Sequence, residues 1–235
     1  MRQLATYVAS IILAVGGANA AVLYEPTPIG SSARTAHYST SDSTGFLPFD
    51  NFTLSLGESV LRATWRGFWI DFNNQVPVPA PSPNVLTWQL GFYADNAGAP
   101  GTQLASSSLL AADVTETFQG TGVFNINGAF NVSFYEYSVD LPTAFVPSAA
   151  GQYWFSILSV AGASNPAFAL RGATGGDDLS YQQQLGAGMS VVTGNPVARD
   201  RAIRLEGEVP EPGTIALAGM ALLALPLLRR TRTNS

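Results

Sequence analysis

The 235-residue chain contains no cysteine and no lysine, and His37 is its single histidine. Without cysteine, the chain cannot form disulfide bonds, thiolate metal sites or a cysteine nucleophile. Without lysine it cannot form a Schiff base, and one imidazole is too few for a histidine-based metal centre. A Ser-His-Asp site would have to use His37, and the sequence has no Gly-x-Ser-x-Gly motif. We therefore expect His37 to be a surface or turn residue.

Charged residues are also scarce, at 11% of the chain against about a quarter in ordinary globular proteins. The net charge is −5, and the region 21–208 has 7 arginines against 15 acidic residues, or about −8. This excess of acid argues against a nucleic-acid partner, because phosphates are bound by lysine and arginine. Hydrophobic residues make up 46% of the chain, which is enough to bury a core.

The longest apolar stretches lie at the two ends of the chain. At the N-terminus an arginine precedes the apolar stretch 4–15, and Ala18-Asn19-Ala20 follows it. A positive charge, a short apolar segment and a small-x-small sequence, in that order, are typical of a secretory signal peptide. We expect residues 1–20 to be such a signal peptide, which signal peptidase recognises through Ala18 and Ala20. The mature chain then begins at Ala21.

The C-terminal end has three successive elements, which are Val209-Pro210-Glu211-Pro212, the apolar stretch 215–228 and a cluster of arginines. As a helix, 14 residues span about 21 Å, short of the ~30 Å hydrocarbon core of a bilayer, so the stretch is marginal as a permanent anchor. Arginines after it favour a cytoplasmic C-terminus and an external remainder of the chain. The two prolines hold Glu211 in an extended segment that suits a protease groove.

These residues resemble the PEP-CTERM sorting signal of Gram-negative bacteria, a Val-Pro-Glu-Pro motif followed by a short transmembrane helix and arginines. The resemblance rests on Val209, Pro210, Glu211, Pro212, the stretch 215–228, Arg229 and Arg230. It implies that residues 209–235 are a sorting signal recognised by an exosortase-like membrane protease. It also implies a transient inner-membrane-tethered intermediate, followed by release to the cell surface or the exopolysaccharide matrix of a biofilm. The resemblance concerns routing and implies no activity.

Between the two ends the hydrophobic pattern alternates with the period of β-strands. Apolar residues occupy every second position in 61–69 and in 86–92, which predicts strands with one buried face. The segment 95–101 is rich in Gly, Asn and Ala and predicts a turn, after which 104–110 returns as the partner strand. In 202–207, Ile203 and Leu205 should point inward, which makes this segment the last strand before the sorting motif.

Three further segments refine this prediction. The apolar positions change parity at Phe134–Tyr135, where we expect a β-bulge. The segment 153–160 is apolar on both faces, which indicates a central strand covered on both sides. The proline-rich segment 76–83 is expected to be an extended surface loop. About eight to ten strands over residues 21–208 then predict one antiparallel β-sandwich, most similar to a jelly roll.

Aromatic residues could form a platform on which sugar rings stack. The four tryptophans are more typical of a core, with Trp154 the least certain of them; they are Trp65, Trp69, Trp88 and Trp154. Three tyrosines remain open candidates for an exposed platform, namely Tyr93, Tyr135 and Tyr137.

Carboxylates are the other candidate functional groups. Glu136 and Asp140 could serve glycoside hydrolysis, but four residues along one strand separate them by about 13 Å, so each would need a partner from another strand. Calcium is the ion that the ligand chemistry favours, because acidic and amide side chains lie on glycine-containing loops. The candidates for a structural calcium site are Asp95, Asn96, Asp177 and Asp178. Plain turns explain the same residues.

The sequence therefore predicts an exported surface or matrix protein with a structural or adhesive role in association with exopolysaccharide. A carbohydrate-binding module is the alternative, and a glycan-cleaving enzyme is a weaker one. No catalytic residue and no resident cofactor is predicted.

Overall fold

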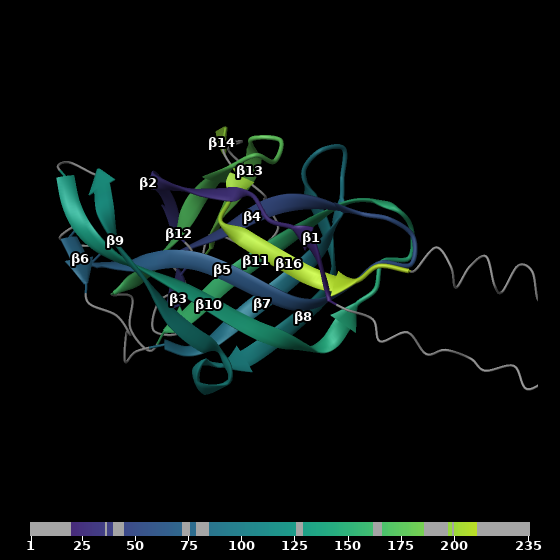
Figure 1. The fold of residues 1–235 in the computed structure, drawn as a ribbon, viewed down its shortest axis with the longest axis horizontal. Coiled ribbons are helices and arrows are strands. Elements are labelled where there is room, and N and C mark those ends of the chain that lie inside the picture. Colours follow the sequence, from purple (N-terminus) through teal and green to yellow (C-terminus); the bar gives the residue numbers. More distant parts are fainter. Residues whose placement is uncertain are drawn as a thin grey trace, which may run out of the picture.

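The computed structural model describes residues 20–35, 37–39, 45–71, 76–78, 85–125, 129–161, 166–185, 197–198 and 200–210 (Figure 1). In these residues the chain is all-β apart from one turn of 3-10 helix, η1 (Ala111–Asp113). Sixteen strand segments are present there, so the expected eight to ten was too few. The first strand begins at Ala21 and the last ends at Glu208.

The strands form two sheets that pack face to face as a β-sandwich. The path of the nine-stranded sheet is β1 (Ala21–Tyr24), β16 (Ile203–Glu208), β5 (Ser59–Asp71), β10 (Ala129–Phe145) and β9 (Thr115–Asn125). Off this path, β12 (Ala167–Thr174) and β6 (Val76–Val78) pair with β5, and β2 (Thr27–Thr35) and β15 (Asp200–Arg201) pair with β12.

The seven-stranded sheet has the order β14 (Val197–Ala198), β13 (Leu179–Leu185), β4 (Gly45–Leu54), β3 (His37–Ser39), β11 (Gly151–Ala161), β7 (Val85–Asp95) and β8 (Pro100–Leu110). Strand β11 also pairs directly with β4. Among the described strands, only β3 and β11 pair in parallel, and the remaining pairs are antiparallel. His37 begins β3.

Several sequence predictions are confirmed by this register. The pairing of β10 with β9 shifts between Phe134 and Tyr135, where the bulge was expected. Strand β11 is buried on both faces from Tyr153 to Val160 and lies between β4 and β7. The prediction for 76–83 was wrong in part, because Val76–Val78 forms strand β6 against the end of β5.

Strand β7 also differs from its prediction at one end. Trp88, Leu90 and Phe92 point into the core as expected, but Leu86 is exposed. Leu86 falls at a register shift, since Thr87 pairs with Val160 and Val85 pairs with Ala161. The pairing skips Leu86, and Val85 packs against the core instead.

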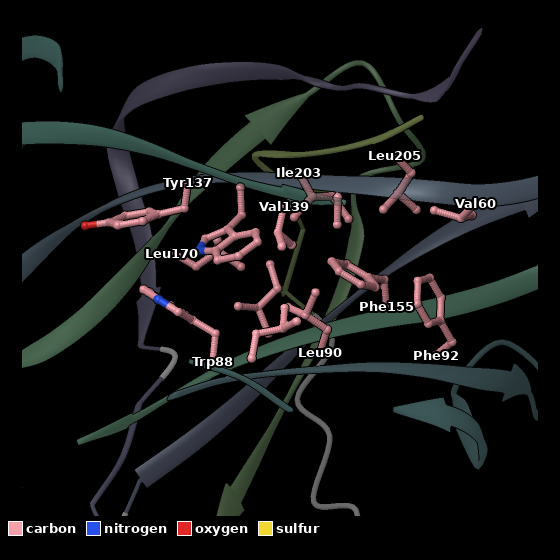
Figure 2. Packing of buried hydrophobic residues seen from close by; sticks show 14 of the residues in the cluster. Val60, Trp88, Leu90, Phe92, Tyr137, Val139, Phe155, Leu170, Ile203 and Leu205 are labelled. Carbon is pink, nitrogen blue, oxygen red and sulfur yellow. The ribbon is translucent and has the colours of Figure 1, made fainter. Parts of the chain in front are cut away.

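The centre of the core is an aromatic contact between the two sheets. Trp88 comes from β7, and its ring lies 5.0 Å from the rings of Tyr137 and Phe168 in the opposite sheet, measured between ring centroids. Trp65 and Trp69 complete the surroundings of Trp88 at 5.1 Å and 6.2 Å. Figure 2 shows Trp88 reaching from its strand toward Tyr137 and Leu170. Edge-to-face and tilted aromatic pairs of this kind add about 0.5–1.5 kcal/mol each to simple area burial.

A second aromatic contact joins the sheets further along the core. Phe92 of β7 stacks on Phe145 of β10 with centroids 4.3 Å apart, and Phe155 of β11 packs on Phe92 at 5.0 Å. Tyr153 meets Phe145 edge to face at 5.5 Å. The chain has no cysteine, so such packing holds the two sheets together without disulfide bonds.

One polar cluster is buried between the sheets, around Asp50 of β4. Its Oδ2 accepts hydrogen bonds from the Tyr24 hydroxyl at 2.9 Å and from the backbone N–H of Arg201 at 3.0 Å. Its Oδ1 has no hydrogen-bond partner. Burial, with a smaller contribution from Asp200, raises the pKa of Asp50 well above its ordinary value of 3.8. Asp50 therefore ties β1 and β15 to the opposite sheet through these two hydrogen bonds.

Replacing Asp50 by Asn should remove a pH dependence from the stability of the fold. The folded protein keeps the Asp50 proton after the unfolded chain has released it, so the wild-type unfolding free energy falls as the pH rises above about 4. Asp50→Asn keeps the acceptor for Tyr24 and Arg201 but cannot ionise. Urea unfolding from about pH 4 to about pH 7 should show the variant losing less stability than the wild type. Asp113→Asn, at an exposed position, is the control. Parallel curves for the wild type and Asp50→Asn would contradict the assignment.

Candidate functional site

The outward faces of the two sheets differ in their chemistry. The nine-stranded sheet presents ion pairs between neighbouring strands, with Arg62 and Asp140 at 2.9 Å and Arg66 and Glu136 at 2.6 Å. Each of these pairs occupies directly opposed positions of β5 and β10. Arg66 also contacts Glu25 at 3.2 Å. This face is a charged surface in which acids and bases neutralise one another.

The ion pairs bear on the proposed glycan-cleaving role of Glu136 and Asp140. The two residues lie on one strand, and each is opposed by an arginine of β5. The Arg66 guanidinium, which binds Glu136, also binds Glu25 in the connection between β1 and β2. A glycosidase needs sugar and water between its two carboxyl groups. Here an arginine occupies that position.

Around the middle of β7 the seven-stranded sheet presents neutral side chains instead, and the charged Asp95 lies at the end of that strand. In β7 the outward positions alternate with the buried Leu90 and Phe92, and they hold Gln89, Gly91 and Tyr93. Register places the neighbouring outward residues of β8, β11 and β4 beside them, namely Gln103, Ser106, Ser108, Ser156 and Phe49. The face therefore offers hydroxyl, amide and aromatic groups.

A hollow of about 280 Å³ opens in the middle of this neutral face. Its polar lining consists of Gln89, Tyr93, Gln103, Ser106, Ser107, Ser108 and Ser156, and its apolar lining includes Leu47, Leu90 and Leu158. Among the described residues, no charged side chain lines the hollow. We call it the Gly91 hollow, because Gly91 lies at its base in the register between Ser156 and Ser106.

The hollow exists because position 91 has no side chain. A Cβ added to Gly91 would lie 2.7 Å from Cε2 of Tyr93 and 2.8 Å from Oγ of Ser156, closer than real Cβ atoms approach other atoms. Any other residue would push the Tyr93 ring outward or fill the space. Glycine within a strand commonly marks such a close approach.

Tyr93 forms one wall of the Gly91 hollow and is held in place on two sides. Its ring meets the buried ring of Phe49 edge to face, with centroids 5.1 Å apart. Its hydroxyl accepts a hydrogen bond of 3.4 Å from the Ser156 hydroxyl. Burial raises the pKa of Tyr93 above its ordinary value of 10, and the bond from Ser156 acts in the opposite direction. The phenol is thus a neutral group with a proton to donate.

Trp154 packs within this face near the end of β7, beside Tyr93 and Asp95. It points outward from β11, yet it is fully buried, which resolves the uncertain assignment of this tryptophan in favour of packing. Its ring meets Tyr181 edge to face at 5.2 Å, and its Nε1 donates to Asp95 at 2.9 Å. The other three tryptophans are buried in the core as predicted.

The three candidate tyrosines have different positions. Tyr93 lines the Gly91 hollow. Tyr135 is half-buried on the nine-stranded sheet, with its ring 5.7 Å from the exposed Phe118. The expectation for Tyr137 was wrong, because its side chain is 3% exposed and its hydroxyl accepts a 2.9 Å hydrogen bond from Trp69 Nε1 inside the core. The odd positions of β10 from the bulge onward face inward, so Tyr137 points the same way as Val139.

The residues proposed for calcium lie on two loops and already accept hydrogen bonds from the protein. Asp95 accepts from Trp154 Nε1 and from the backbone N–H of Gly98 at 3.1 Å. Asn96 closes the same turn through backbone bonds with Ala99. These bonds are typical of a turn stabilised by its own side chains.

The second loop connects β12 with β13 and is fixed by a buried acid. Asp177 accepts from the backbone N–H of Leu179 at 2.9 Å and from the side-chain amide of Asn51 at 2.6 Å. The backbone N–H groups of Gly176 and Asp178 both donate to the buried carboxylate of Asp200. Within the described part of the chain, no three acidic or histidine side chains gather closely enough to hold a metal ion.

Of the residues predicted for export and sorting, the structure describes Ala20, Val209 and Pro210. Ala20 is exposed and directly precedes β1, and Val209 directly follows β16. The other predicted residues lie outside the described residues; they are Ala18, Glu211, Pro212, Arg229 and Arg230. Within the described ranges, no helix combines the length and the apolar composition that crossing a bilayer requires.

Comparison of the chain with family models, with curated proteins and with solved structures gave no match in any of the three. The site is therefore interpreted from its own chemistry. Sequence reasoning identified Tyr93 and the outward position of Gln89, but it missed Gly91, Ser106 and Ser156. The alternation in β7 could have singled out Gly91, whereas the residues beside it follow from a register that one sequence does not show.

Removing divalent cations should leave the fold unchanged. The carboxylate oxygens of Asp95 and Asp177 are taken by N–H donors, so we expect the melting temperature to be the same with a chelator as with added calcium. Differential scanning calorimetry measures this directly. Asp178→Asn removes the exposed carboxylate of Asp178, and asparagine tolerates the φ of 59° at this position, so the variant should have the melting temperature of the wild type. A melting temperature that rises by several degrees with calcium and falls with chelator would instead establish a structural calcium site.

Proposed function

We propose that the protein is exported to the cell surface or the extracellular matrix and adheres there to neutral polysaccharide through the Gly91 hollow. The observation that supports this most is the uncharged lining of the hollow by hydroxyl, amide and phenol groups. Serine, glutamine and tyrosine side chains both donate and accept hydrogen bonds, as sugar hydroxyls do. The sandwich is proposed to be jelly-roll-like, which its repeated crossings between the two sheets support.

The class of ligand is inferred from the absence of charge in the lining of the hollow as well as from the hydrogen-bonding groups of that lining. An uncharged polysaccharide leaves no charge to be buried without a partner in this hollow, whereas an acidic or basic one would. The hollow is at the small end of ligand sites, which are about 300–1,000 Å³. A single sugar unit should therefore bind weakly, and a polymer that engages many copies of the protein should bind strongly through avidity. Weak binding of single sugars together with strong binding of a polymer is what adhesion within a matrix requires.

Routing is the second part of the proposal and rests on the sequence of the two ends. Residues 1–20 are proposed to be removed by signal peptidase, and residues 209–235 to be a PEP-CTERM-like signal processed by an exosortase-like protease. We propose no catalytic role for the protein, since the acidic pair considered for one is bound by arginines.

Substitution within the hollow should weaken retention on polysaccharide. Tyr93→Ala removes a wall of the site, and Ser106→Glu places a charge at its exposed rim. Each should weaken retention in affinity electrophoresis through neutral glucan, galactan or mannan gels by about tenfold, the loss expected for one dominant contact.

Tyr135→Ala is the control, because Tyr135 is a half-buried tyrosine of β10 in the other sheet, where it packs against the core cluster and does not line the Gly91 hollow. It should be retained like the wild type. Melting curves establish that each variant is folded. If the wild type is retained and both hollow variants are retained equally well, the Gly91 hollow is not the binding site.

Intact-mass analysis of the protein recovered from cells tests the routing. We expect an N-terminus at Ala21 and a C-terminus that has lost the residues beyond the Pro-Glu-Pro region, because both ends are proposed to be processing signals. Pro210→Ala with Pro212→Ala should leave the tail in place. A mature wild-type protein that still contains Arg229 and Arg230 would refute cleavage of the tail.

A further inference from the structure

Both ends of the described chain leave the sandwich at the same pole. Ala21 of β1 pairs with Gly207 of β16, and Gly207 pairs with Val60 of β5. Val60 in turn pairs with Phe145 at the end of β10. These four residues form one row across the nine-stranded sheet. Figure 1 accordingly shows the purple first strand and the yellow last strand ending on one side of the molecule.

This terminal pole, defined as turn 55–58 with Val146 and Val209–Pro210, exposes large apolar side chains. Leu56 is 70% exposed, Val146 is 64% exposed and Val209 is 44% exposed. Each directly adjoins the row described above, because turn 55–58 precedes β5, Val146 follows β10 and Val209 follows β16. Exposed apolar residues around the point where a chain leaves a domain are a candidate contact surface.

The turn that presents Leu56 is rigid. The Glu58 N–H donates to the Ser55 carbonyl at 3.2 Å, the Ser55 N–H donates to Oε2 of Glu58 at 2.7 Å, and Gly57 has φ of 89°. This positive φ is the one that the third position of a type II turn requires, and glycine adopts it without strain. Leu56 therefore remains at the tip of the turn.

Pro210 rests on the same turn. A Cβ added to Gly57 would lie 2.7 Å from Cγ of Pro210, so the proline packs directly over the glycine. The chain thus leaves the sandwich beside Leu56, and the position of its exit relative to the pole is fixed by contact.

The length of chain beyond Pro210 limits how far this pole can be from a bilayer. Only residues 211–214 separate Pro210 from Ile215, the first residue of the apolar stretch 215–228. Five residue steps span at most about 18 Å when fully extended. A headgroup layer is itself about 5–8 Å thick on each side of the hydrocarbon core. If the stretch enters a bilayer, the terminal pole is held within about 10–13 Å of the headgroups.

The charges of the pole favour apolar contact over electrostatic attraction. Glu58 lies in the turn and Glu208 ends β16, and no arginine belongs to the described residues of the terminal pole. The nearest arginine along β5 is Arg62, which is paired with Asp140. Anionic lipids attract basic segments, so they should give this pole no advantage over zwitterionic lipids.

We infer that the terminal pole is a membrane-contact surface, on which Leu56, Val146 and Val209 rest against the bilayer while the tail is inserted. The inference depends on the proposed membrane insertion of the tail. The bilayer is the occupant because the short connection brings it to this pole and to no other part of the sandwich. The contact orients the tethered protein, with the far ends of β7 and β8 directed away from the membrane.

Single-cysteine labelling of the full chain tests this inference, because the native sequence has no cysteine. Leu56→Cys and Val146→Cys place a bimane fluorophore on the terminal pole. Leu110→Cys is the matched control, an exposed leucine at 60% whose position pairs with Thr87 at the opposite end of β7 and β8. Phosphatidylcholine vesicles contain a lipid with a nitroxide near the top of its acyl chain. We expect at least twofold stronger quenching at positions 56 and 146 than at position 110.

Flotation of the vesicles distinguishes the possible failures. If the chain floats with the vesicles but the three positions are quenched equally, the membrane-contact surface is refuted and insertion of the tail stands. If the chain does not float, insertion is refuted and the contact surface with it. If the bimane spectrum at position 56 shifts with protein concentration in the absence of vesicles, a second copy of the chain is the occupant, which also overturns the inference.

Discussion

The contact between Trp88 and the aromatic rings of the opposite sheet is the interaction on which the rest of the structure depends. Trp88 is the one member of this cluster from the seven-stranded sheet, and Trp65, Trp69, Tyr137 and Phe168 from the other sheet surround it at 5.0–6.2 Å. A chain without cysteine cannot cross-link its sheets, so interlocking aromatic side chains perform that task. The inward positions of the central strands are consequently committed to packing.

The outward positions are free to differ, and the two faces have diverged. On β5 and β10 they form cross-strand ion pairs such as Arg66 with Glu136, which neutralise each other and leave little for a ligand. Around the middle of β7 they are uncharged, and the omission of a side chain at Gly91 opens a hollow beside Tyr93. The same sandwich thus combines a face of paired charges, a face with the uncharged Gly91 hollow and, at the exit of the chain, an apolar pole. The proposed adhesive role depends on the second of these, and the inferred membrane contact depends on the third.

Much of the fold could be predicted from local patterns, because alternation and turn residues act over a few positions. The inward side of β7, the bulge at Phe134–Tyr135 and the covered strand β11 were all accessible in this way. Tyr137 was nevertheless kept as a candidate for the surface, although the change of parity at the bulge already places the odd positions of β10 inward. In the structure its side chain is buried in the core. The candidate site was harder to predict, because it depends on how the strands pair. Gly91 and Ser156 come from strands far apart in sequence, and their meeting depends on a register set by the whole core.

The central claim is that the neutral face of the seven-stranded sheet binds polysaccharide. Hydrogen–deuterium exchange of the folded protein with and without a neutral polysaccharide measures this most directly, because it locates contact along the backbone without altering any residue. The account predicts that exchange slows in β7 and β8, around Gly91 and Ser106, and is unchanged in β5, β10 and β16. Protection confined to β5 and β10, on the face of Arg62 and Arg66, would contradict it.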